Sequence, residues 1–306
     1  MDGFCLQSPN LCTKIIRIAK RDMMQKSCPK ISLRFVFAIV SIPIILACSL
    51  ANTSTLQTPP TLSAATETPS GIPFFASPIR LIIPSGLAIS ASTDTIDVVT
   101  DQTGTSWDVA PAHLQITLHS YLLESSFHVP QIFVYPAQDY AVVNQKAAES
   151  IKRLKGILAS PNAQYTDDVL PYIPFINAGQ VFAAQEKILQ FNGGSGLRIV
   201  TQYASDVSPI NNGGLFYHFE GLTNDGKYYI VAILPTNLPF LPVDNNPNSP
   251  VPSGGIAFPH NNASGSDFEN YFKQVTNRIT STASDQFNPP MNALDALIQS
   301  ISIQAQ

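Results

Sequence analysis

Four consecutive strand-like runs in the second half of the chain constrain the fold more than any other feature. The connections between them contain Asn-Gly or Asp-Gly steps, which are the strongest local signals for a β-hairpin. We therefore expect an antiparallel meander. The last run is apolar on both faces over Tyr228–Leu234, so it should be a central strand that is covered on both sides. The four runs are Val181–Phe191, Leu197–Ala204, Leu215–Thr223 and Tyr228–Pro235.

Shorter strand-like runs precede the meander. Arg80–Ile83 and Thr95–Thr100 are bounded by Pro, Gly and Ser, and His113–Leu122 alternates apolar and polar residues as a half-buried strand does. A further run covers His128–Tyr135. Pro130 within it indicates either an edge strand or a late strand start, because proline cannot donate to a sheet ladder.

Helical patterns flank the meander. Apolar residues form one stripe over Ala137–Ala159, which predicts a single helix with Asn144 on its polar side. Near the end of the chain, Ser266–Glu269 has the spacing of a capping box, and Asn288–Pro290 is typical of a second helix start. The predicted fold is α+β: an antiparallel meander with helices packed on it as an α-β-α sandwich, in one globular domain over residues 73–306.

A short apolar segment near the N-terminus predicts the location of the protein. Basic residues precede the run Phe35–Ala47, and Cys48 and a Ser/Thr/Pro-rich tract follow it. This order, with Ile45-Leu46-Ala47-Cys48, resembles the signal peptide and lipobox of bacterial lipoproteins. The resemblance implies that residues 1–47 are removed, that Cys48 is acylated, and that residues 48–72 tether the domain to the extracytoplasmic face of a bacterial membrane. Translation from Met23 or Met24 would give a more ordinary precursor.

Two alternatives to lipidation remain open. The uninterrupted apolar run has 13 residues, whereas a membrane-spanning helix needs roughly 17–25. The length therefore disfavours an uncleaved membrane anchor. Secretion without an anchor is the other alternative.

Charge and cysteine usage exclude several functions. Of the 17 basic and 21 acidic residues, 7 and 2 precede Cys48, so the mature chain keeps 10 basic and 19 acidic residues and a net charge of −9. Such a field repels polyanions, so we expect no nucleic-acid partner. All four cysteines lie at or before position 48, which leaves the mature domain without a disulfide, a zinc–thiolate site or a cysteine nucleophile.

The C-terminal part of the chain resembles a second family. Gly221–Tyr229, with its Gly-Leu-Thr-Asn-Asp-Gly-Lys-Tyr-Tyr sequence, is similar to a hairpin of the photosystem oxygen-evolving subunit P and its bacterial lipoprotein relatives. The similarity covers about Gln180–Ile303 and rests on the order of strands and helices. Leu294–Ile301 is also similar to segments of other bacterial lipoproteins. The resemblance implies a binding or assembly module and supplies no catalytic residues.

Histidine and carboxylate side chains on the predicted sheet form the candidate site. His218 and Glu220 lie two residues apart on one strand and so share a face, and His119 reaches them only if the strands bring it across the sheet. No motif with metal-ligand spacing accompanies them, and we predict no metal, cofactor or catalytic residue.

Three functions follow from these observations. The leading hypothesis is a lipid-anchored extracytoplasmic binding or assembly module whose ligand the sequence does not identify. The alternatives are a lipid-anchored hydrolase that uses a His–carboxylate pair on the sheet face, and a structural envelope protein. A hydrolase requires a concave site in which His119 or His218 meets a carboxylate.

Overall fold

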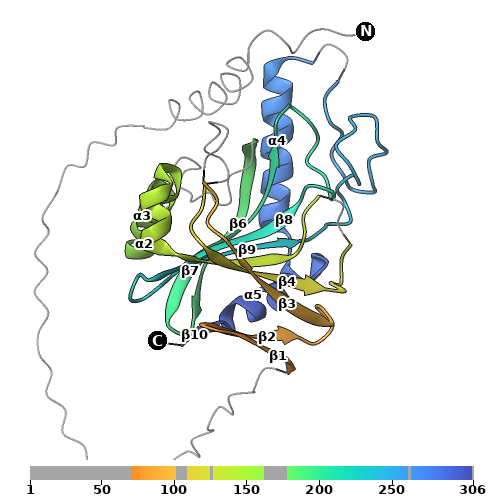
Figure 1. Cartoon of the computed structure of the whole chain (residues 1–306). Coiled ribbons are helices and arrows are strands. Elements are labelled where there is room, and N and C mark those ends of the chain that lie inside the picture. The colour runs from red at the N-terminus through yellow and green to blue at the C-terminus, as the bar shows by residue number, and fades with distance from the viewer. Residues whose placement is uncertain (1–69, 101–108, 125–126, 162–177, 261–262, 305–306) are drawn as a thin grey trace, which may run out of the picture.

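The computed structural model describes residues 70–100, 109–124, 127–161, 178–260 and 263–304. These residues form an α+β fold built on antiparallel sheets, as the sequence predicts (Figure 1). The strands are β1 (Gly71–Ala76), β2 (Ile79–Pro84), β3 (Ser90–Ile96), β4 (His113–His119), β5 (Gln131–Pro136), β6 (Gly179–Phe191), β7 (Gly194–Ala204), β8 (Phe216–Thr223), β9 (Tyr228–Pro235) and β10 (Ser302–Ile303). The helices are α2 (Ala137–Val143), α3 (Gln145–Ala159), α4 (Gly265–Ser281) and α5 (Met291–Gln299), with a 3₁₀ turn at Ser284–Gln286.

The larger sheet has seven strands in the order β3-β4-β5-β9-β8-β7-β6. The predicted meander is confirmed as β6 to β9, and β9 is central, between β5 and β8. Every residue of β8 is buried, so this strand is covered more completely than β9. Of the two alternatives for Pro130, the late strand start is confirmed and the edge strand is wrong. β5 begins one residue later and lies inside the sheet, while the Pro130 carbonyl accepts a hydrogen bond from Leu118.

Helices cover the two faces of this sheet (Figure 1). α2 and α3 pack on one face through Tyr140, Ile151 and Leu154. The opposite face is covered by α4 and α5, and the small sheet joins the same core. Because side chains alternate along a strand, successive residues of β8 and β9 enter two different cores. This is the physical basis of the apolar pattern on both faces of Tyr228–Leu234.

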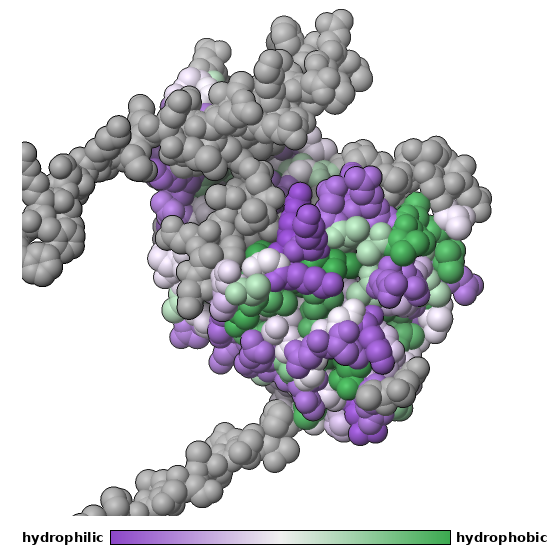
Figure 2. Space-filling model, turned by 90° about the vertical axis from the view of Figure 1, so that its left-hand side faces the viewer, coloured by the Kyte–Doolittle hydropathy of each residue, from purple (hydrophilic) through white to green (hydrophobic). Residues whose placement is uncertain are grey.

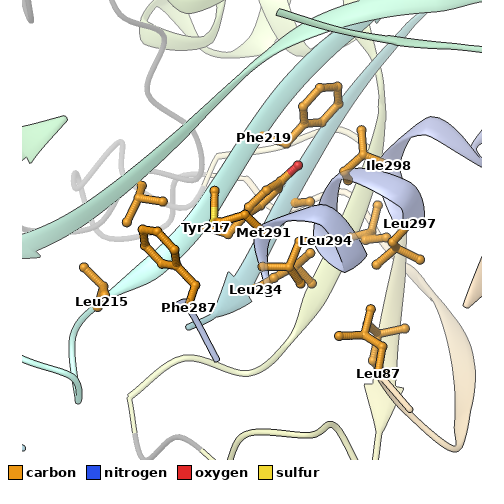
Figure 3. Close-up of a cluster of buried hydrophobic side chains, with 14 of the residues drawn as sticks. Leu87, Leu215, Tyr217, Phe219, Leu234, Phe287, Met291, Leu294, Leu297 and Ile298 are labelled. Carbon is orange, nitrogen blue, oxygen red and sulfur yellow. The ribbon is translucent and has the colours of Figure 1, made fainter. Parts of the chain in front are cut away.

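The larger core lies between α5 and the sheet (Figure 3). Tyr217 and Phe219 project from β8 toward the helix, which presents Leu294 and Ile298. The apolar residues on the inward side of α5 are all buried: Met291, Leu294, Leu297 and Ile298, with Ile301 just beyond the helix.

The single helix expected over Ala137–Ala159 is divided at Asn144. This residue is extended rather than helical, and its Oδ1 accepts hydrogen bonds from the backbone N–H groups of Lys146 and Ala147 at 3.0 and 3.2 Å. Its Nδ2 donates to the carbonyl of Val109 at 2.9 Å, and the residue is buried. The expectation of an exposed Asn144 is thus wrong, because its side chain starts a new helix and closes a long-range contact.

The start of α4 also differs from expectation. The capping residue is Ser264 rather than Ser266, and the backbone N–H of Ser264 donates to Asp267 at 2.7 Å. At the other end, the Nε2 atom of Gln185 lies 2.8–3.1 Å from three terminal carbonyls of the helix. Gln185 adopts a positive φ of 58° at a register shift in β6, which directs its side chain to the helix end.

A small sheet joins the two ends of the domain. β2 pairs with β1 on one side and with β10 on the other, in the order β1-β2-β10. The hydroxyl of Ser300 also bonds both the N–H and the carbonyl of Ile82. β1 begins at Gly71, two residues before the expected domain boundary. Within the described residues, no helix has the length and apolarity required to cross a membrane.

Candidate functional site

The candidate site lies on β8, in the middle of the α2/α3 face. His218 and Glu220 are two residues apart, so both side chains leave the strand on the same side. The neighbouring residues on β7 and β9, Leu197 and Val231, belong to the core beneath α2 and α3. The sequence prediction that His218 and Glu220 share a face is therefore confirmed. Their surroundings are a packed interior rather than a polar surface.

The two side chains form a direct pair. Nε2 of His218 lies 2.7 Å from Oε1 of Glu220. The second carboxylate oxygen accepts a hydrogen bond from the hydroxyl of Tyr229 on β9. In the neutral tautomer that carries its proton on Nε2, the imidazole donates to the carboxylate and keeps a lone pair on Nδ1. Nδ1 has no hydrogen-bond partner in the part of the chain that the structure describes.

Aromatic rings surround the pair. The ring of Phe216 meets His218 edge-on at 5.7 Å and also contacts His128 at 4.3 Å. On the other side, Tyr135 and Tyr140 stack at 4.4 Å. Burial and then the charge of Glu220 raise the pKa of Tyr140, and the same causes act on Tyr135 together with the charge of Tyr140. Both phenols are therefore neutral donors at physiological pH.

Two further histidines are held near this region in their neutral form. Burial lowers the pKa of His128 to about 4, the hydrogen bond to Gly214 opposes this effect, and the neighbouring His218 adds to it. Burial also lowers the pKa of His113, whose Nδ1 lies 2.8 Å from the carbonyl oxygen of Pro111. Neither residue is positioned as a ligand. Across the described residues, no group of three His, Cys, Asp or Glu side chains has the arrangement of a metal site.

His119 does not join the pair. It is the last residue of β4, three strands from β8 in the sheet, and is exposed. Its Nε2 lies 2.7 Å from the hydroxyl of Ser92 on the adjacent edge strand. The sequence could not place it, because the order of strands across the sheet is not written in the local pattern. The predicted polar face thus consists of a buried pair and a separate surface histidine.

The geometry supplies part of the requirement for acid–base catalysis. A carboxylate that orients one imidazole nitrogen and leaves the other as a base is the arrangement of a general base. Solvent access is the missing part, since His218 is 2% and Glu220 0% exposed. A shallow hollow of about 390 Å³ lies elsewhere, between α3 and the β8–β9 turn, and is lined by Lys155, Ser195 and Asp225 among others. It contains neither member of the pair.

The surface over this face also lacks a broad apolar area in the visible part. Figure 2 shows the side of the molecule that carries α2 and α3, where apolar residues occur in small groups separated by hydrophilic ones. The predicted lipid-attachment residue, Cys48, and the predicted tether up to residue 69 lie outside the described residues.

Sequence reasoning missed two members of the polar interior. Tyr229 could have been found from the hairpin register, because the Asp-Gly turn places it opposite Leu222 and diagonal to Glu220. Asp295 on α5 had no such signal. Its carboxylate lies 2.9 Å from Lys187 Nζ, 3.3 Å from Arg198 and 3.1 Å from the Tyr217 hydroxyl, on the opposite face of the sheet.

Comparison with known proteins identifies no relative. No family model, curated protein or solved structure matches the chain. The two resemblances drawn from the sequence therefore stay predictions.

Proposed function

We propose that the protein is a lipid-anchored module on the extracytoplasmic face of a bacterial membrane, and that it binds a partner or supports an assembly there. The anchor is supported by the basic and apolar residues before Cys48 and by the polar tract after it. The choice of binding over catalysis rests on one observation. The best acid–base pair among the described residues, His218 with Glu220, is closed to solvent.

The anchor is tested through Cys48. Metabolic labelling with palmitate, followed by detergent partition, should show a labelled membrane protein. Cys48→Ala should lose the label, because only this thiol follows the apolar run. Cys28→Ala is the matched control and should keep the label, since Cys28 lies in the segment expected to be removed. Equal labelling of both variants would contradict the lipoprotein assignment.

The His218–Glu220 pair favours a hydrolase as the second candidate function. If it acts as a base, wild-type protein should hydrolyse members of a panel of chromogenic esters, phosphoesters and glycosides. His218→Ala and Glu220→Gln should then abolish turnover while Tyr203→Phe, on the neighbouring strand, keeps it. If the pair is structural, the wild type should show no turnover, and the two variants should lower only the urea midpoint.

A structural envelope protein is the third possibility that the sequence leaves open. Such a protein needs no dedicated binding surface, whereas a binding module exposes one. The distribution of exposed apolar side chains therefore separates these two functions.

A further inference from the structure

Large aliphatic side chains are exposed at one end of the domain. We call Ile72, Ile89, Leu122 and Val129 the tether-side patch. Their exposed fractions are 42%, 70%, 52% and 54%. Single exposed apolar residues are ordinary on protein surfaces, but a group of them on adjacent chain segments marks an interaction site.

Backbone hydrogen bonds bring these segments together. Leu122 N–H donates to the Leu87 carbonyl at 2.8 Å, and Ile89 N–H donates to the His119 carbonyl at 3.0 Å. Next to them, the Leu118 N–H donates to the carbonyl of Pro130, which follows Val129. Ile89, Leu122 and Val129 therefore lie at the shared end of β3, β4 and the start of β5, where neighbouring strands are roughly 5 Å apart.

The described chain begins at the same end. The carbonyl of Ser70 accepts a hydrogen bond from Ser85 N–H at 3.4 Å, in the turn that leads to Ile89. Ile72 follows on β1, which lies with β2 at the lower end of the domain in Figure 1. Cys48 precedes Ser70 by 22 residues. A chain of that length reaches at most about 70–80 Å, so it permits contact between the patch and the bilayer without requiring it.

We infer that the tether-side patch contacts the bilayer surface and orients the domain on the membrane, an inference that rests on the proposed lipid anchor. The four side chains are aliphatic and uncharged, Ser85 and Ser90 are also uncharged, and the nearest charged residue in the sequence is the exposed Glu124, two residues after Leu122. Contact with the interface should therefore persist on neutral lipid and need no anionic headgroup. A mature chain with net charge −9 gains nothing from anionic lipid.

The experiment uses the absence of other thiols in the mature chain. Lipidation consumes Cys48, so an introduced cysteine is the only reactive thiol. The full-length lipidated protein carries a polarity-sensitive fluorophore at Ser85→Cys, beside the patch, or at the exposed position Asn270→Cys in α4. In Figure 1, α4 extends to the end of the domain opposite β1 and β2. Each is reconstituted in phosphatidylcholine vesicles containing nitroxide-labelled lipid. We expect blue-shifted emission and several-fold stronger quenching at Ser85→Cys than at Asn270→Cys.

Substitutions in the patch provide the second arm. Ile89→Ser with Leu122→Ser should abolish the difference between the two probe sites. Val142→Ser with Val243→Ser is the matched control, because these residues are at least as exposed but lie elsewhere, and it should preserve the difference. Urea midpoints check that both double variants remain folded.

Three outcomes would overturn the inference. The first is equal quenching at the two probe sites, and the second is a quenching difference that survives Ile89→Ser with Leu122→Ser. The third is a blue shift that increases with the number of protein molecules per vesicle and comes without quenching by the nitroxide lipid, which would mean that a second copy covers the patch. Absence of palmitate labelling in the unsubstituted protein is a different result, because it contradicts the lipid anchor itself. Labelling is therefore measured before the protein is reconstituted in vesicles.

Discussion

Asn144 shows how one side chain can decide the course of a helix. Its amide oxygen caps α3 and its amide nitrogen bonds the carbonyl of Val109, 35 residues earlier in the chain. Both groups are needed, because a helix start leaves backbone N–H groups without partners and a buried carbonyl loses its water.

Replacement of Asn144 should therefore be costly. Asn144→Ala should lower the free energy of unfolding by about 2–3 kcal/mol, from a lost cap and an unsatisfied carbonyl. Asn144→Asp keeps the acceptor but sets a carboxylate oxygen against the Val109 carbonyl oxygen at a buried position, so it should not restore the stability lost in Asn144→Ala. Lys152→Ala, on the exposed side of α3, is the control and should change stability by no more than about 0.5 kcal/mol. Urea denaturation checks the order, and equal midpoints for Asn144→Ala and Lys152→Ala would contradict it.

At the scale of an element, β9 is the first test. Ile230 is fully buried and Ile233 is partly exposed, although both belong to the same apolar run. Ile230→Ala should destabilise the protein by about 2–5 kcal/mol through lost burial and a cavity, and Ile233→Ala by distinctly less. Thermal or urea unfolding of the two variants measures the difference. Comparable losses would mean that β9 is equally covered on both faces.

The docking of α5 is the second element-scale test. Asp295 is buried between Arg198, Tyr217 and Lys187, and removal of the carboxylate leaves the buried guanidinium without its counter-charge. Asp295→Ala should cost about 3–5 kcal/mol. Lys187→Ala should cost less than about 1 kcal/mol, because the lysine side chain is 52% exposed and well solvated. If the two variants unfold at the same urea concentration, the buried pair does not hold the helix.

The sequence predicts the elements well where local pattern and burial agree. The meander is legible because hairpin turns and apolar faces coincide in β6 to β9. The pattern fails where a polar residue turns inward. The helical stripe runs through Asn144 without showing the break, and Ser264-Gly-Ser266 offers two capping residues of which only the first is used. For the His218–Glu220 pair, the alternation of side chains along a strand predicts the shared face. The burial of the pair depends on tertiary packing and could not be predicted from the sequence.

Over the whole molecule, we expect partly or fully buried histidines to make stability depend on acid. The pKa of His128 is about 4 in the folded protein and near 6.5 when unfolded, because burial disfavours the charged ring. Above pH 6.5 neither state binds the proton, and the stability that the neutral ring allows is complete. As the pH falls from 6.5 to 4, the unfolded chain takes up the proton first, so the folded state loses at most about 1.4 kcal/mol per pH unit.

Urea titrations at several pH values between 6.5 and 4.5 measure this loss. His128→Gln should flatten the dependence, with His113→Gln as the comparison because its pKa is lowered as well. His218 lowers the pKa of His128 and is therefore left unchanged in both variants. A slope that His128→Gln leaves intact would assign the acid response to other groups.

The small sheet sets the timing of assembly. β2 emerges early from the ribosome, yet one of its two partners is β10 near the end of the chain, and Ile82 and the Ser300 hydroxyl that bonds it are 218 residues apart. Until the last residues are synthesised, one edge of β2 is unpaired, and this edge could pair with strands of other polypeptides. A protein truncated by a few residues at its C-terminus would thus be left open at its beginning.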